Sequence, residues 1–307
     1  MSKVKSAPKA GIRTFLTGLS GACQAKAPCF RGGHEVQNIG QNRIIGDLHQ
    51  DADLPFDRFM AQVIRDFIHL FNTIKFPLIK RIVFEGESDP EFIDSQGHLD
   101  AYIDPCDASL DAVYAGWGVG LPYSVVVTLT SSKNNPLFKD IVGAAVIDLR
   151  PGVDDYWSGF RGSEDNSCRP FLNERLIRID ETAWTIDDRR VFGFEMYYPQ
   201  NRRLMLALLG EQKGYFRNCG SAGVEMAMVS SGQLASWVCC RQKLHELGAG
   251  WFLVKGAGGW VRDFTGQELD EQSFVFNSQK AVILAATPQL GEGILQRVQA
   301  IPRRVWQ

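Results

Sequence analysis

The chain has 307 residues, of which 45% are hydrophobic and 22% are charged, so it can bury one large core or two closely packed ones. Lysine and arginine total 33 against 35 for aspartate and glutamate, and this near-neutral balance gives no reason to expect a nucleic-acid polymer or a membrane surface as partner. No apolar run approaches the roughly 20 residues of a membrane-spanning helix.

The first half of the chain alternates helix and strand signals, which favours an α/β or α+β fold. Apolar residues at helical spacing predict an amphipathic helix over 55–72. Strands predicted over 81–85 and 100–104 both end at acidic residues, so side chains at the two strand ends can converge. Two apolar runs, 123–130 and 141–149, flank a polar turn and predict an antiparallel hairpin.

The second half continues the alternation, beyond a cluster of glycine and proline at about 150–175 that is a soft boundary. The predicted halves are 1–160 and 161–307, closely packed on one another. Asn201 is the predicted cap of a helix that includes 204–209. The remaining predicted elements are strands over 156–160, 176–179, 191–198 and 282–286, and helices over 220–231, 246–256 and 289–298.

Cysteine and histidine usage gives no sign of a metal site. The seven cysteines form no C-x-x-C pair, which disfavours a zinc site or a disulfide framework and favours a reducing, cytoplasmic setting. The five histidines, at 34, 49, 69, 98 and 245, show no metal-ligand spacing, and each is predicted to be structural or exposed.

The segment Asp104-Pro105-Cys106-Asp107-Ala108-Ser109 carries the clearest chemical signal. With Glu87 upstream, its two aspartates offer the carboxylate oxygens that Mg²⁺ prefers, and the Cys106 carbonyl could add another. If a helix begins here, the amides of Ala108 and Ser109 would favour a bound phosphate. A D-x-x-D pair alone is more often a solvated turn, so the interpretation depends on other motifs.

Five motifs in order resemble the inositol monophosphatase-like superfamily of magnesium-dependent, lithium-sensitive phosphatases, which includes bisphosphate nucleotidases and fructose bisphosphatases. Residues 104–109 match its D-P-[IL]-D-[GS]-[ST] motif, and Gly86-Glu87-Ser88 matches its G-E-E element. His245 to Gly250 matches W-D-x-A-A-G, and the further matches are Gly220 to Gly223 with G-S-A-A and Ala257 to Gly266 with A-G-G-x-V-x-D-x-x-G. Together they cover roughly residues 45–295.

The resemblance implies a layered α-β-α-β-α sandwich, with an antiparallel sheet in the first half, a smaller mixed sheet in the second, and a homodimer. It also implies two or three Mg²⁺ ions. The implied metal-binding residues are Glu87, Asp104, Cys106 through its carbonyl, Asp107 and Glu246.

Further roles follow from the same resemblance. Glu87, Ser109 and Asp51 are the implied catalytic residues, with Ser109 helping to activate water and Asp51 near a further metal. Ala108 and Ser109 would bind the phosphate, and Ser221 and Lys243 the substrate. Lys243 is equally well interpreted as a surface lysine.

The predicted function is Mg²⁺-dependent hydrolysis of a small phosphorylated metabolite, a sugar, polyol or nucleotide phosphate. The alternative is a catalytically weak or inactive member that binds metal or a phosphorylated ligand as a regulator. Departures from the family pattern motivate it: Ala108 replaces a usual glycine, Glu246 an aspartate, and His245 a tryptophan. Cys239 stands where inositol-selective members carry a substrate-binding glutamate, which leaves the substrate open.

Overall fold

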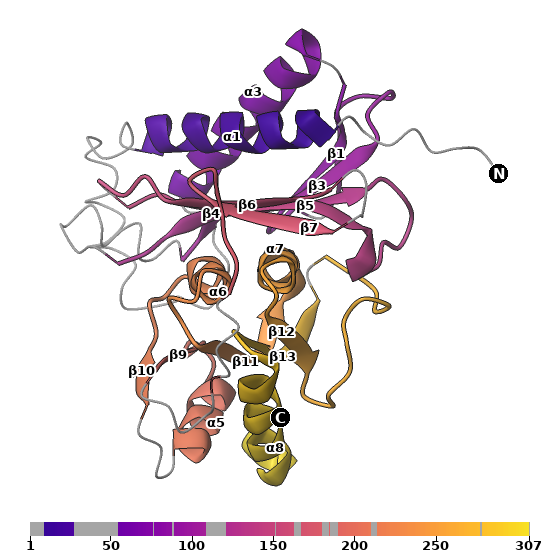
Figure 1. The fold of residues 1–307 in the computed structure, drawn as a ribbon. Coiled ribbons are helices and arrows are strands. Elements are labelled where there is room, and N and C mark those ends of the chain that lie inside the picture. Colours follow the sequence, from indigo (N-terminus) through magenta and orange to yellow (C-terminus); the bar gives the residue numbers. More distant parts are fainter. Residues whose placement is uncertain are drawn as a thin grey trace.

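The computed structural model describes residues 9–27, 55–75, 77–87, 89–108, 121–150, 152–162, 167–179, 184, 190–209, 214–276 and 278–306. These residues form two β-sheets separated and flanked by helices, in the order α-β-α-β-α (Figure 1). The predicted sandwich is therefore confirmed.

The first sheet has eight strands among the described residues, in the order β2-β1-β3-β4-β5-β6-β7-β8. Their bounds are β1 Ile79–Phe84, β2 Glu91–Phe92, β3 Leu99–Asp107, β4 Ser124–Ser131, β5 Ile141–Asp148, β6 Tyr156–Arg161, β7 Cys168–Leu172 and β8 Arg175–Leu176. The predicted hairpin is confirmed, since β4 pairs antiparallel with β5. One neighbouring pair, β1 with β3, is parallel.

Two long helices, α1 (Lys9–Lys26) and α3 (Pro55–Ile74), cover the outer face of this sheet (Figure 1). Met60, Ile64 and Ile68 of α3 recur every four residues and are fully buried, so the predicted amphipathic helix is present, although Leu70 of its predicted apolar face is exposed. They belong to one hydrophobic core with the outward-facing residues of β1 and β3. The sheet is thereby closed on its outer side.

The second sheet is mixed, with the order β10-β9-β11-β13-β12. Its strands are β9 Val191–Phe194, β10 Tyr215–Arg217, β11 Ser236–Lys243, β12 Trp260–Asp263 and β13 Gln279–Ala285. Helices α5 (Pro199–Leu209) and α8 (Pro288–Ala300) cover its outer face (Figure 1). Two short 3₁₀ helices complete the described elements, at Phe138–Asp140 and Arg303–Val305.

The middle layer consists of α6 (Ala222–Ser230) and α7 (Leu244–Gly256), which lie between the two sheets (Figure 1). All of α7 from Leu244 to Val254 is buried, because a helix between two sheets has no solvent face. Side chains from both sheets therefore meet the ends of these two helices.

Three predicted elements differ from the structure. Helix α5 begins at Pro199, and Asn201 lies inside it, where its amide accepts from the Cys240 N–H at 2.6 Å, so the predicted cap is wrong. The strand predicted over 191–198 ends at Phe194, before the turn that leads to this proline. The strand predicted over 176–179 is reduced to the end of β8.

Within the part of the chain that the structure describes, no helix combines the length and the apolar character needed to cross a membrane.

Candidate metal centre

A bulge in β3 turns two carboxylates toward the middle layer. Asp104 pairs with Val126 of β4, and Asp107 pairs with Ser124. The two aspartates are three residues apart on β3, whereas their partners are only two residues apart on β4. In a regular strand, residues three apart point to opposite faces. The extra residue, within Pro105-Cys106, restores the alternation, and a bulge tolerates a proline because proline has no N–H to donate. Asp104 and Asp107 therefore both face α6 and α7.

Four side chains that could hold a metal ion converge there. Glu85, Asp104, His245 and Glu246 each offer one ligand atom, and these atoms all lie within 4.8 Å of one another. Glu85 directly follows β1, Asp104 lies on β3, and the other two belong to the first turn of α7. The cluster thus joins the first sheet to the middle layer, with Asp104 only 2% exposed.

Asp107 lies beside this cluster and is fixed by hydrogen bonds. Its Oδ2 accepts from the Ser221 hydroxyl at 2.5 Å, from the Gly223 N–H at 2.7 Å and from the Ser124 hydroxyl at 3.3 Å. Ser221 is also the N-cap of α6, so the start of that helix holds the carboxylate. Burial, and then the charge of Glu246, raise the pKa of Asp107 to about 8.

The electrostatics of the cluster show an excess of buried negative charge. Burial and the nearby charges of Glu85, Asp107 and Glu246 hold the pKa of Asp104 well above its usual range. Burial alone would raise the pKa of Glu85, but hydrogen bonding and the charges of His245 and Lys243 outweigh it and hold that pKa below its usual range. Carboxylates in this state fit a divalent cation, because buried charges require a partner of opposite sign.

Comparison with known proteins places this geometry in a family. The model of the inositol monophosphatase family matches residues 154–303. The fructose-1,6-bisphosphatase/inositol-1-monophosphatase of Thermotoga maritima is 24% identical over 245 residues, which are 79% of this chain and 82% of that protein. The inositol-1-monophosphatase of Rhizobium meliloti is 26% identical over 195 residues, 60% and 64% of the two chains. The chain is thus similar to the inositol monophosphatase family, over its second half by the family model and over most of its length by the first of these relatives.

Solved structures of the same fold agree over nearly the whole chain. The extragenic suppressor protein suhB of Bartonella henselae has a TM-score of 0.65 at 17% identity, covering 94% of this chain and 97% of its own. An IMPase/NADP phosphatase solved with Mg²⁺ and phosphate has a TM-score of 0.60 at 14% identity, with 87% and 92% covered. The family match and these relatives indicate a phosphatase, that is, a phosphoric monoester hydrolase.

The structure places Glu85, and not Glu87, in the cluster. The Glu85 N–H still donates to the Ile103 carbonyl at 2.9 Å, so Glu85 continues along β3, whereas Gly86 has a φ of 82° and turns the chain away. Glu87 consequently forms an ion pair with Arg65 of α3, and its side chain is 40% exposed. The prediction that Glu87 joins Asp104 and Asp107 is wrong.

A sequence signal for Glu85 exists in the alternation of β1. Val83 packs in the core of the middle layer, whereas Ile82 and Phe84 pack in the outer core. Continuing this period of two puts Glu85 on the inner face, on the same side as Asp104. Matching Glu87 to the family motif concealed the pattern.

The other predicted residues that the structure describes lie close to the cluster. Lys243 is an inner residue, since its ammonium bonds to Glu85. Ser221 donates to Asp107, and Ala108 follows Asp107 in the left-handed backbone region, with a φ of 66°. The Cys106 thiol packs in the outer core, while the Cys106 N–H donates to Asp104 Oδ1 at 2.9 Å. Two predicted residues, Asp51 and Ser109, lie outside the described residues.

His245 was predicted to be structural or exposed; it is buried, and it lies inside the cluster. Burial would lower the pKa of the imidazole, but the carboxylates of Glu246 and Glu85 outweigh burial and raise it to about 9. Its position directly before Glu246, at the start of α7, was the available sequence signal.

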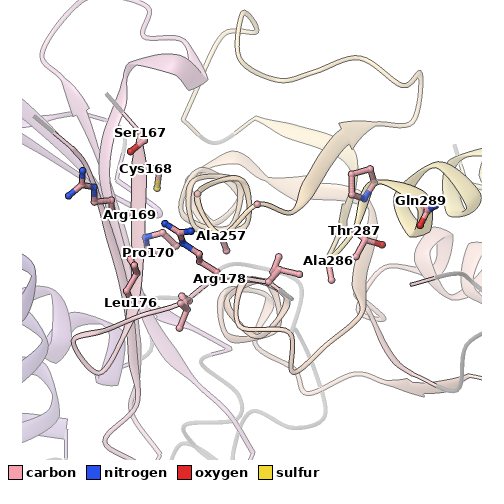
Figure 2. A pocket seen from close by; sticks show the side chains of 15 residues that line it. Ser167, Cys168, Arg169, Pro170, Leu176, Arg178, Ala257, Ala286, Thr287 and Gln289 are labelled. Atoms are coloured by element: carbon pink, nitrogen blue, oxygen red, sulfur yellow. The ribbon is translucent and has the colours of Figure 1, made fainter. Parts of the chain in front are cut away.

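A separate groove lies at the other end of α7. Figure 2 shows Arg178, Thr287 and Cys168 among its lining residues, around the end of α7 at Gly256 to Gly258. No cluster residue lines it. Ten residues of α-helix separate Glu246 from Gly256, which corresponds to about 15 Å, so the groove is no part of the candidate metal centre.

Proposed function

We propose that the chain hydrolyses a small phosphate monoester with the help of divalent cations held by Glu85, Asp104 and Glu246. One observation carries the proposal: these carboxylates, of which Asp104 and Glu246 are buried and Glu85 is half-buried, come from two different layers of the fold and converge with His245 to within 4.8 Å. Carboxylates repel one another, so such a convergence is stable only with cations in place or with protons in their stead.

When bound, divalent cations supply Lewis-acid stabilisation of phosphate oxygens and lower the pKa of water. The residues of the chain then have distinct tasks. Asp107 is oriented by the start of α6, through Ser221 and the Gly223 N–H, and contributes a carboxylate of fixed position. Lys243 contributes a positive charge beside Glu85, suited to a phosphate oxygen. Ala108 and Ser109 stay the proposed phosphate-binding residues.

The leaving-group side of the site is proposed to include Glu195. This residue follows β9, and its Oε1 accepts from the Tyr197 N–H at 2.5 Å. Burial, and then the charge of Glu246, raise the pKa of Glu195 to about 7. It lies near Cys239, the position at which inositol-selective relatives are expected to carry a glutamate. A hydroxylated leaving group, in a sugar or polyol phosphate, would suit this carboxylate.

The deciding experiment measures phosphate release from sugar, polyol and nucleotide monophosphates and bisphosphates, with Mg²⁺ or Mn²⁺. Glu85→Gln removes a charge from the cluster, so kcat/KM should fall by about a hundredfold or more, the equivalent of several kcal/mol. Glu87→Gln is the matched control two residues away and should leave kcat/KM within about threefold. A larger loss for Glu87→Gln would contradict the proposed site.

The second candidate is a non-catalytic binding protein. Two observations favour it: the Lys243 ammonium already bonds a cluster carboxylate, and Ala108 has a backbone conformation that suits glycine. Metal binding that is abolished by Asp104→Asn, without phosphate release from any ester by the wild-type chain, would support this candidate over hydrolysis.

The division into halves at residue 160, the homodimer and the cytoplasmic setting stay predictions. A measurement of mass in solution tests the homodimer directly.

A further inference from the structure

His245 is the one residue of the four-member cluster that differs in ligand chemistry. Its side chain is 0% exposed, and Nε2 lies 3.3 Å from Glu85 Oε2 and 3.6 Å from Glu246 Oε1. The ring also packs against Phe276, with centroids 5.1 Å apart. The imidazole is thus held among carboxylate oxygens and an aromatic ring, away from solvent.

Nδ1 of this imidazole has no hydrogen-bond partner among the described residues, whereas Nε2 faces the carboxylates of Glu85 and Glu246 at ion-pair distance. A buried polar group without a partner costs about 1–3 kcal/mol, and such groups are rare in folded proteins. Nε2 lies within reach of the same point as the three carboxylates, where a bound ion would take the place of the imidazole proton.

The backbone around His245 holds the ring in this place. The His245 carbonyl accepts from the buried Thr128 hydroxyl of β4 at 3.2 Å. One turn later, Gly248 lets α7 approach β4 so closely that an added Cβ would lie 2.8 Å from Thr128 Oγ1. Helix α7 is fixed against the first sheet at this point, so the imidazole is pre-positioned before any ion binds.

We propose that His245 is a metal ligand, so that the centre has one imidazole and three carboxylates and selects a first-row transition-metal ion over Mg²⁺. Hard Mg²⁺ prefers oxygen ligands, whereas imidazole nitrogen suits ions such as Mn²⁺, Fe²⁺, Co²⁺ and Zn²⁺. The inference shares Glu85, Asp104 and Glu246 with the proposed function and specifies which cation they hold.

The first test detects the nitrogen ligand by pulsed EPR spectroscopy of the Mn²⁺-loaded full-length protein. The expected spectrum shows ¹⁴N coupling to Mn²⁺, which becomes ¹⁵N coupling when the protein is grown with ¹⁵N-histidine. This comparison needs no variant, so it does not depend on a mutant's folding. A wild-type spectrum with no nitrogen coupling would overturn the proposal, because His245 would then be only a counter-ion.

Variants assign the coupling to one residue. His245→Gln should abolish it, whereas His69→Gln, at an exposed histidine of α3, should leave it unchanged. Titration calorimetry gives the matching affinities: His245→Gln should weaken Co²⁺ binding by about tenfold or more while Mg²⁺ affinity changes less than about threefold. Equal losses for both ions would overturn the proposal.

The two proposals can fail separately. If the centre binds Mg²⁺ through oxygen alone and the protein still releases phosphate, the histidine ligand is refuted and the hydrolase is supported. If nitrogen coupling is observed but the protein hydrolyses no ester, the histidine ligand is supported and the hydrolase is refuted.

Discussion

Ala108 occupies the left-handed backbone region, with a φ of 66°, immediately after the acidic motif. In this region a residue with a Cβ is less stable than glycine by about 1–2 kcal/mol. Part of the gain from glycine is lost, because glycine also increases the conformational entropy of the unfolded chain. Ala108→Gly should therefore raise the free energy of unfolding by about 1 kcal/mol, as measured by urea denaturation.

The same substitution within a helix provides the control. Ala22 lies inside α1, where glycine costs about 1 kcal/mol relative to alanine. Ala22→Gly should therefore lower the free energy of unfolding. If both variants were destabilised to the same extent, the backbone at Ala108 would not be strained.

The buried acids of the site predict how the stability of the metal-free protein depends on pH. The pKa of Asp107 is raised to about 8 and that of Glu195 to about 7, so the folded chain binds more protons than the unfolded chain between about pH 4 and 8. The raised pKa of His245 acts in the same direction up to about pH 9. The lowered pKa of Glu85 acts in the opposite direction, but only in more acidic solution.

We therefore expect the free energy of unfolding in EDTA to fall as the pH rises from 5 to 8. Urea titrations at several pH values measure the slope. Asp107→Asn should flatten it, since asparagine does not titrate, whereas Asp66→Asn, at an exposed position of α3, should not. A stability that rises over this range would contradict the prediction.

At the scale of the element, the position of α7 depends on a close approach to the first sheet. An added Cβ at Gly248 would lie 2.7 Å from Phe274 Cε2 and 2.8 Å from Thr128 Oγ1, and both residues are buried. Gly248→Ala should thus cost about 1–3 kcal/mol of stability and should also weaken metal binding, because Glu246 moves with the helix.

Gly21 of α1 is the matched control, because an added Cβ there meets no atom within 4 Å. Gly21→Ala should stabilise the protein by about 0.4–1 kcal/mol. Thermal unfolding of both variants, with a metal titration of each, tests the pair. Stabilisation by both substitutions would mean that α7 can move away from β4 without cost.

Elements with one buried face and one exposed face were predictable from sequence, because their apolar and polar residues follow a pattern. Helix α3 follows its apolar spacing, and the hairpin of β4 and β5 follows two β-branched runs with a turn between them. The middle of the second sheet was harder, because β11 is buried along most of its length and shows no alternation. Cys239 on that strand was singled out only by its place in the family pattern.

The candidate site was predictable in kind and only partly in detail. Asp104 and Glu246 lie in the cluster as the motifs suggested, because both motifs keep their place in the fold. Glu85 was missed because motif matching counts positions along the chain and does not register the turn at Gly86. His245 was missed because its only local signal is its neighbour Glu246, and its other cluster partner, Glu85, is distant in sequence.

At the scale of the whole molecule, the cluster connects two layers. Asp104 belongs to the first sheet and Glu246 to the middle layer, so a cation bound between them links both. Saturating metal at a hundred times its Kd should stabilise the folded protein by about 2.7 kcal/mol. Hydrogen exchange should slow in β3 and α7 together.

Removal of metal by EDTA should reverse both effects, and Asp104→Asn should prevent them. Exchange measured by mass spectrometry with and without metal separates the two layers. Slower exchange in β3 alone, with α7 unchanged, would show that the ion does not link them.

The bulge in β3 makes the acidic site depend on a strand that contributes no acid to it. If β4 had one extra residue between Ser124 and Val126, the two strands would have equal numbers of residues between these pairs, and the bulge would disappear. Asp107 would then point toward α1 and α3, although every carboxylate of the chain would be unchanged. Conversely, loss of Cys106 would leave a D-P-D pair whose acids share a face in an ordinary strand. Insertions and deletions in these two strands could therefore abolish or preserve the site during evolution in ways that an inventory of its acidic residues would miss.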